Sequence, residues 1–183
     1  ALVPARVDVL VLYTPAARGA HTFHGLAMGS SYTVKIATAG LSSATLDAAQ
    51  EQVAEALGDV VARMSHYEAD SEVSRLNRQP IGEPFAVSAP TLQVFEVAGA
   101  VRAASGGAFD ITYASVGQLY DYRLGVRPSE EALAVARAAV GWRKLELDAH
   151  QRTVRFTQAG MRIDLGGFAK GHAKVSLTDD GGA

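Results

Sequence analysis

The sequence predicts an α+β fold in which helices pack on a mainly antiparallel sheet. Apolar residues recur at helical spacing over residues 46–64, 89–104 and 130–140. Apolar and polar residues alternate, as in half-buried strands, over residues 30–37, 143–148, 152–157 and 161–165. The short turn between 143–148 and 152–157 indicates an antiparallel hairpin. We therefore expect a single sheet that contains these four strands and is covered by the three helices.

The N-terminal part of the chain predicts short strands. An apolar strand is expected from Val7 to Tyr13, and residues 1–21 are treated as a leader or unassigned segment. Two further strands are expected in residues 22–38, with Met28 and Gly29 between them. Glycine there permits close backbone approach to a flat ligand, with Met28 as an adaptable contact. The alternative is a core methionine beside a bulge glycine.

The three helices have recognisable faces and ends. Residues 46–64 place six apolar side chains on one face, with Thr45 as the expected N-cap. Ser88 is expected to cap residues 89–104, and Ser105-Gly106-Gly107 to end them. The third helix, 130–140, starts after Ser129 and points Leu133 inward.

Residues 161–165 lead into Gly166-Gly167 and a helix start. Such a turn gathers free backbone N–H groups and suits an anion, and Lys170 adds a positive charge one turn later. Asp164, at the expected strand end, can accept a hydrogen bond from a ribose hydroxyl or a ring N–H. Its carboxylate could also face a metal. The alternative is a tight turn with a solvated lysine.

Aromatic and acidic side chains mark other candidate contacts. Tyr67, in a loop, could stack on a planar ring, or pack on its own helix end. Phe109-Asp110, after a Gly-Gly pair, offers stacking beside a hydrogen-bond acceptor. Because one planar ligand needs its aromatic and polar contacts on one wall, we expect Tyr67 and Phe109 to approach the same cleft as Asp164. The loop 113–127 could line a ligand cleft with its polar aromatic and basic side chains, which are Tyr113, Tyr120, Tyr122 and Arg123.

Composition excludes several classes of protein. The 183 residues carry a net charge of −2, so no basic field indicates a nucleic-acid partner. The absence of cysteine excludes disulfides and thiolate metal sites. No apolar run approaches the roughly 20 residues of a membrane span, and no signal-peptide pattern opens the chain. Histidines 21, 24, 66 and 150 have no ligand spacing, and surface or core roles are expected for them.

Four blocks in order resemble the FAD:protein FMN transferases, the ApbE family. They are H-G-L-A-M-G-S at residues 24–30, M-S-H-Y-E-A-D-S-E-V-S-R-L-N at 64–77, S-G-G-A-F-D at 105–110 and D-L-G-G-F-A-K-G-H-A at 164–173. The resemblance covers residues 22–173, the expected N-terminal part of the transferase domain, and leaves 174–183 as a tail. It implies a T-fold-like architecture.

The resemblance also implies a function. Members bind FAD and a divalent metal, usually magnesium, and move FMN onto a threonine or serine hydroxyl of a target flavoprotein, releasing AMP. By motif match the expected FAD contacts are Met28, Tyr67, Ala108, Phe109, Asp110, Asp164 and Lys170. The carbonyl oxygen of Gly167 is the expected metal ligand, and no catalytic residue is assigned. Most members act in the periplasm or cell envelope, which is the expected location.

The chain departs from the family pattern near its end. The resemblance implies a second half with an Asp-x-x-Thr metal site, which these 183 residues do not contain. Lys174-Val175 stands where Val-Asp is usual, and Thr178-Asp179-Asp180 has residue types that suit a metal. We therefore expect a truncated, split or degenerate member. The alternatives to FMN transfer are a FAD-binding module without catalysis and a magnesium-dependent FAD pyrophosphatase.

Overall fold

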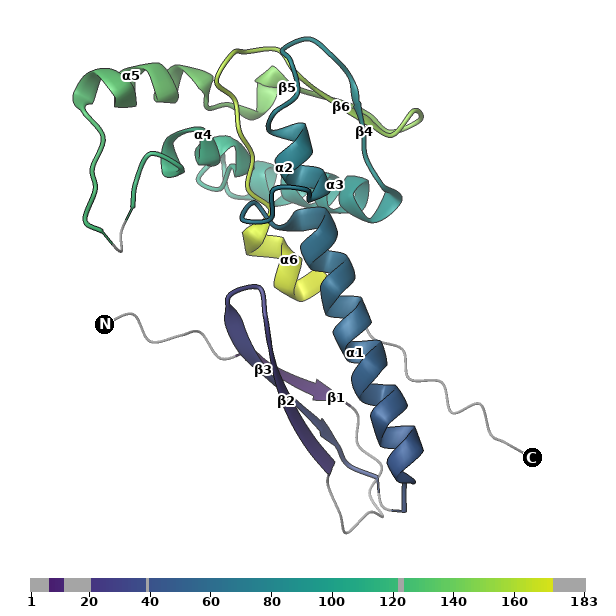
Figure 1. Cartoon of the computed structure of the whole chain (residues 1–183). Coiled ribbons are helices and arrows are strands. Elements are labelled where there is room, and N and C mark those ends of the chain that lie inside the picture. The colour runs from purple at the N-terminus through teal and green to yellow at the C-terminus, as the bar shows by residue number, and fades with distance from the viewer. Residues whose placement is uncertain (1–6, 12–20, 39, 122–123, 173–183) are drawn as a thin grey trace. The chain divides into compact units, whose positions relative to one another are not determined.

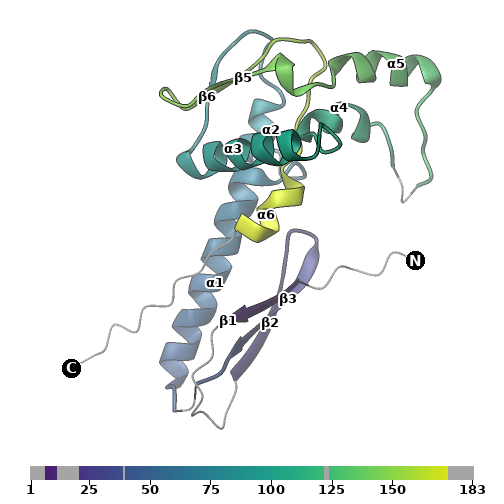
Figure 2. The same ribbon diagram turned by 180° about the vertical axis from the view of Figure 1, so that it is seen from behind.

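The computed structural model describes residues 7–11, 21–38, 40–121 and 124–172. The chain divides into two compact units. The first comprises residues 1–61 and 173–183, and the second comprises residues 62–172. Figures 1 and 2 show the helices and strands of both units with their labels.

The first unit holds a three-stranded sheet in the order β1-β3-β2. β2 (His21–Ala27) runs antiparallel to β3 (Ser30–Ile36), and β1 (Val7–Val11) runs parallel to β3. Met28 and Gly29, at φ values of 51° and 69°, join β2 to β3 as a two-residue turn. The expected strands and the place of Met28 are thus confirmed. The domain division at residue 21 stays a prediction, although β1 pairs with β3.

The core of the first unit lies between this sheet and helix α1 (Ser43–Met64). Val34 and Ile36 of β3 pack with Ala49 and Val53 of α1. The apolar face expected for this helix is confirmed, but the expected N-cap Thr45 is wrong. Ser42 caps the helix, because its Oγ accepts a hydrogen bond from the Thr45 N–H at 3.1 Å.

The second unit holds an antiparallel sheet in the order β4-β6-β5. Its strands are β4 (Phe85–Ala86), β5 (Leu145–Asp148) and β6 (Thr153–Phe156). Its helices are α2 (Glu72–Leu76), α3 (Ala89–Ala104), α4 (Ala114–Gly117), α5 (Glu130–Ala139) and α6 (Gly166–His172), with 3₁₀ turns at Ile111–Tyr113 and Trp142–Lys144. Figures 1 and 2 both show α6 beside α3, and the two helices are in contact.

The predicted α+β class is confirmed, whereas the single predicted sheet is wrong. β3 pairs only within the first sheet, and β5 and β6 pair within the second, among the described strands. Alternation along a strand reports which residues face a core, and it does not report which strands pair. The hairpin of β5 and β6 is confirmed, with β5 starting at Leu145 because the three residues before it form a 3₁₀ turn.

The strand predicted at 161–165 is also wrong, although its alternation is real. Met161, Ile163 and Leu165 are buried, while the residues between them are not. The Ile163 N–H donates to Asn77 Oδ1, and Asn77 Nδ2 donates to the Ile163 carbonyl, both at 2.9 Å. Because a side chain takes these two backbone groups, no neighbouring strand pairs with them. The segment is extended without being part of a ladder.

The motif at residues 64–77 is mainly a capping device. Ser71 caps α2 by accepting from the Ser74 N–H at 3.0 Å, and both serine hydroxyls donate to the Ser65 carbonyl. Glu72, only 8% exposed, accepts from the N–H of Ser88, which caps α3. The hydrogen bonds therefore join α2 to the start of α3 and fix the loop that carries Tyr67.

No helix among the described residues combines the length and the apolar character that a membrane crossing requires.

Candidate functional site

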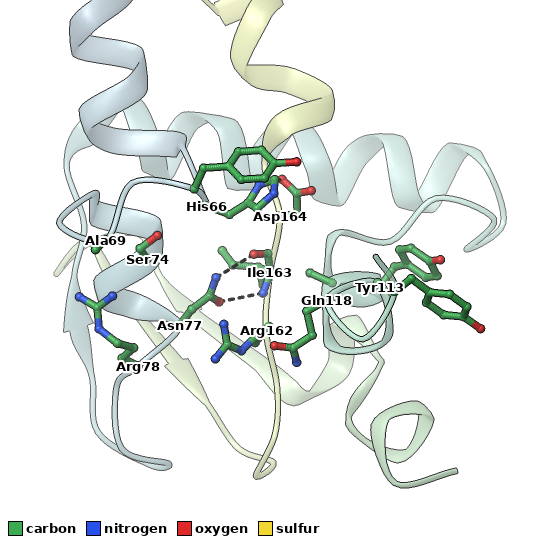
Figure 3. Close-up of a pocket in the computed structure, with 14 residues that line it drawn as sticks. His66, Ala69, Ser74, Asn77, Arg78, Tyr113, Gln118, Arg162, Ile163 and Asp164 are labelled. Carbon is green, nitrogen blue, oxygen red and sulfur yellow. Dashed lines mark hydrogen bonds and ion pairs between the residues drawn. The ribbon is translucent and has the colours of Figure 1, made fainter. Parts of the chain in front are cut away.

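A cavity of about 680 Å³ lies in the second unit. Its polar wall contains three tyrosines, a histidine, a carboxylate, two guanidinium groups and two amides: Tyr67, Tyr113, Tyr120, His66, Asp164, Arg78, Arg162, Asn77 and Gln118. Figure 3 shows His66 and Asp164 together at one end of the cavity, with Asn77 bonded to Ile163 below them. Aromatic faces beside a few convergent polar groups are typical of a site for a small planar ligand.

Three hydrogen bonds hold Asp164 in place. Its backbone N–H donates to the Ile111 carbonyl at 3.1 Å. Its Oδ1 accepts from the Gly166 N–H at 2.7 Å and from His66 Nδ1 at 3.1 Å. Its Oδ2 has no hydrogen-bond partner among the described residues, and the side chain is 42% exposed. One carboxylate oxygen is therefore available to accept an N–H or O–H from a ligand.

Tyr67 presents its ring to solvent at the same cavity. It is 85% exposed, so the alternative of a ring packed on its own helix end is wrong. Its ring lies against the His66 imidazole, with centroids 3.8 Å apart and an interplanar angle of 40°. The prediction that Tyr67 and Asp164 share one cleft is confirmed. An exposed aromatic face beside a carboxylate can hold a planar heterocycle by stacking and hydrogen bonding.

Phe109 is not among the residues that line this cavity, so the expectation that it shares one cleft with Tyr67 and Asp164 is wrong. It forms an edge-to-face pair with Phe168, with ring centroids 5.2 Å apart. A Cβ atom on Gly167 would lie 3.8 Å from the Phe109 ring. The S-G-G-A-F-D and D-L-G-G motifs thus meet, and the structure brings together Phe109 and Gly167, with Ala108 adjacent in the chain.

Asp110 has a structural position. Its Oδ1 accepts from the N–H and the hydroxyl of Thr112, and its Oδ2 accepts from the Trp142 N–H and Arg102 Nε. It caps the 3₁₀ turn at Ile111–Tyr113, and its side chain is 14% exposed. Both oxygens already have protein donors. The FAD contact predicted for Asp110 stays a prediction. Its carboxylate stabilises the 3₁₀ turn, because both of its oxygens accept hydrogen bonds from protein donors.

Acid is expected to weaken the fold through Asp110. Burial raises the pKa of this carboxyl, but the hydrogen bonds from Thr112, Trp142 and Arg102 outweigh burial and hold the pKa below its ordinary value of 3.8. A depressed folded-state pKa gives stability that is present above the ordinary pKa and is lost as pH falls below about 4. Urea unfolding at several pH values should therefore show a free energy of unfolding that declines below about pH 4.

The variant Asp110→Asn tests this assignment. An amide has one acceptor oxygen for four donors, so we expect a loss of about 1–3 kcal/mol in unfolding free energy at pH 7. The difference from the parent should shrink at pH 3, because below the ordinary pKa of 3.8 the unfolded parent takes up a proton at this carboxyl. Asp148→Asn, at the exposed last residue of β5, is the matched control. A parent–variant difference that is the same at both pH values would contradict the assignment.

The FAD contacts predicted for Lys170 and Met28 stay predictions. Lys170 lies in the last turn of α6, and its ammonium group has no partner among the described residues. Met28 belongs to the first unit, in the turn between β2 and β3.

Several cavity residues were missed from the sequence. Tyr113 and Tyr120 were expected and do line the cavity, while Tyr122 and Arg123 lie outside the described residues. His66 was expected in a surface or core role, and no role at a ligand site was predicted for Asn77, Gln118, Arg78 or Arg162. Neither guanidinium group has an ion-pair partner among the described residues. Alternation around Ile163 placed Arg162 outside the core, but only the fold brings it to the same cavity as Arg78 and Gln118.

No three side chains among His, Asp and Glu gather within the described ranges in a way that could hold a metal ion. Gly167 lies in the first turn of α6, and only its carbonyl could contribute. Thr178, Asp179 and Asp180 fall outside the described part of the chain.

Comparison with known proteins gives the class to which this fold and site belong. Residues 28–178 match the ApbE family. The structure superposes on the flavin transferase ApbE from Vibrio cholerae with a TM-score of 0.73 and 31% identity, covering 84% of this chain and 50% of that one. It superposes on the apo flavinyl transferase ApbE of Pseudomonas stutzeri with a TM-score of 0.74 and 28% identity, covering 85% and 49%. The chain belongs to the ApbE family.

Relatives with assigned activities are longer than this chain. The FAD:protein FMN transferase of Haemophilus influenzae is 33% identical over 154 residues, which are 80% of this chain and 44% of that protein. The FAD:protein FMN transferase of Vibrio cholerae is 33% identical over 153 residues, again 80% of this chain and 44% of its own length. The chain thus spans less than half the length of these two relatives.

Proposed function

We propose that this chain is the flavin-binding part of a FAD:protein FMN transferase, which moves FMN from FAD to a threonine or serine hydroxyl of a target flavoprotein. The observation that carries the proposal is the single cavity that joins the exposed ring of Tyr67 to the available oxygen of Asp164. Membership of the ApbE family supports FAD as the ligand.

The proposed reaction is a displacement at phosphorus. The acceptor hydroxyl oxygen bonds to the FMN phosphorus, the phosphoanhydride bond to AMP breaks, and the hydroxyl proton is lost to a base. Tyr67 would hold a flat ring by stacking, and Asp164 would accept an N–H or O–H of FAD. Arg78 and Arg162 would make the cavity potential more positive, which favours an anionic dinucleotide.

Magnesium is part of the proposal because the family resemblance implies it. When bound, it would supply positive charge to the phosphates. Gly167 is the one described residue predicted to contribute to it, and the described side chains form no cluster that would hold the ion alone. The family resemblance also implies a periplasmic or cell-envelope location, which is part of the proposal. Cell fractionation tests this location.

The test is a reaction of the full chain with FAD and magnesium chloride, with and without a threonine-containing acceptor peptide. Chromatography measures AMP and FMN, and mass spectrometry measures FMN on the peptide. AMP together with flavinylated peptide supports the proposal. AMP with free FMN alone identifies a FAD pyrophosphatase, and the absence of FAD binding overturns the proposal.

A flavin-binding module without catalysis is the second candidate. The observation that favours it is the cavity itself, whose ring and carboxylate contacts suffice for binding, whereas catalysis also needs a positioned hydroxyl and charge on the phosphates. Binding of FAD with no AMP released, in the presence of magnesium and acceptor, would identify this function.

A further inference from the structure

His66 joins the two candidate ligand contacts of the cavity. Its Nδ1 lies 3.1 Å from Asp164 Oδ1, and its ring packs on that of Tyr67. The residue is 98 positions from Asp164 in the chain, so the contact is made only by the fold. The proposed function gives His66 no role of its own.

The chemistry of the pair determines which atom donates. An ionised carboxylate oxygen only accepts hydrogen bonds, so the Nδ1 atom must carry the hydrogen and donate to Oδ1. Oδ1 also accepts from the Gly166 N–H at 2.7 Å. Two donors from different segments thus converge on one carboxylate oxygen. They restrict rotation of the carboxylate and leave Oδ2 without a partner among the described residues.

We propose that His66 is a positioning residue for ligand binding. It holds Asp164 through Oδ1 so that Oδ2 is presented to an N–H donor of a planar nitrogen heterocycle stacked on Tyr67. The proposal rests on the proposed function, because that heterocycle would be a ring of FAD. The physical basis is preorganisation: a carboxylate already oriented in the free protein loses less conformational entropy when the ligand binds.

Removing the donor should weaken binding. In the full chain, His66→Ala is expected to reduce FAD affinity about tenfold, measured by titration of flavin fluorescence. His66→Asn keeps a side-chain N–H that can reach Oδ1, so it should stay within about threefold of the parent. His150→Ala, in the exposed turn between β5 and β6, is the matched control and should bind like the parent.

A double-mutant cycle separates the two contacts of His66. If His66 acts through Asp164, the effect of His66→Ala should largely vanish in an Asp164→Asn background and persist in a Tyr67→Ala background. The reverse pattern would mean that the imidazole only supports the Tyr67 ring, and it would overturn the proposal. Equal affinity of His66→Ala and the parent would overturn it as well.

A readout without flavin keeps this test separate from the proposed function. Nitrogen-15 NMR of the neutral His66 ring should show mainly the Nδ1–H tautomer in the parent and a loss of that preference in Asp164→Ala, which has no side-chain acceptor. A neutral ring that carries its hydrogen on Nε2 in the parent would overturn the proposal. If the parent binds no FAD, the proposed function fails, and the tautomer alone decides whether His66 holds Asp164.

Discussion

Replacing Asn77 with alanine is expected to lower the free energy of unfolding by about 3 kcal/mol, since it leaves the N–H and the carbonyl of a buried residue without partners. Asn77 bonds both backbone groups of Ile163, each at 2.9 Å, and the Ile163 side chain is fully buried. Urea unfolding of the parent and the variant, without ligand, measures the loss.

Two further variants show whether the loss comes from these bonds. Asn77→Asp keeps the acceptor for the Ile163 N–H and removes the donor to its carbonyl, so we expect an intermediate loss. Arg78→Ala changes the next, exposed residue and should shift the unfolding free energy by less than about 0.5 kcal/mol. If Asn77→Ala unfolds at the same urea concentration as the parent, the two hydrogen bonds do not stabilise the fold.

The variant Asp164→Asn is expected to weaken FAD binding by about 1–3 kcal/mol while leaving the fold intact, because a charged acceptor becomes a neutral amide. The amide oxygen can still accept from the Gly166 N–H, which explains why the turn should survive. Flavin fluorescence measures the affinity, and far-UV circular dichroism checks the fold.

Asp148→Asn is the control for this second prediction. Its Oδ1 accepts from the Gln151 N–H at 2.9 Å in the turn after β5, a bond that an amide oxygen can also make. FAD affinity should therefore be unchanged. Parent-like affinity of Asp164→Asn would remove Asp164 from the ligand site.

Local patterns predicted the elements of the second unit well. The boundaries of α3 agree with the prediction, and α5 ends one residue earlier than expected. Ser88 caps α3 as expected, with its Oγ accepting from the Thr91 N–H. These features depend on a few neighbouring residues, such as an N-cap hydroxyl and an apolar face, so the sequence contains the information that determines them.

The candidate site was predicted only in part. The loop position of Tyr67 and the acidic residue before Gly-Gly were visible as local motifs, and the structure places both at one cavity. His66 was expected in a surface or core role, because a histidine without ligand spacing has no local signal. Its partner is 98 residues away, and no local pattern reports such a contact.

The sequence by itself determined the α+β class, the helices, the apolar side of residues 161–165 and the family resemblance, since each depends on residue order and local spacing. Only the tertiary structure decided how backbone groups were satisfied and which carboxylate remained available. Asn77 replaced a neighbouring strand at Ile163, and four donors enclosed Asp110, while Asp164 kept one oxygen without a partner among the described residues. The reason is that a backbone or carboxylate oxygen bonds whichever donor the fold brings within reach, regardless of separation along the chain.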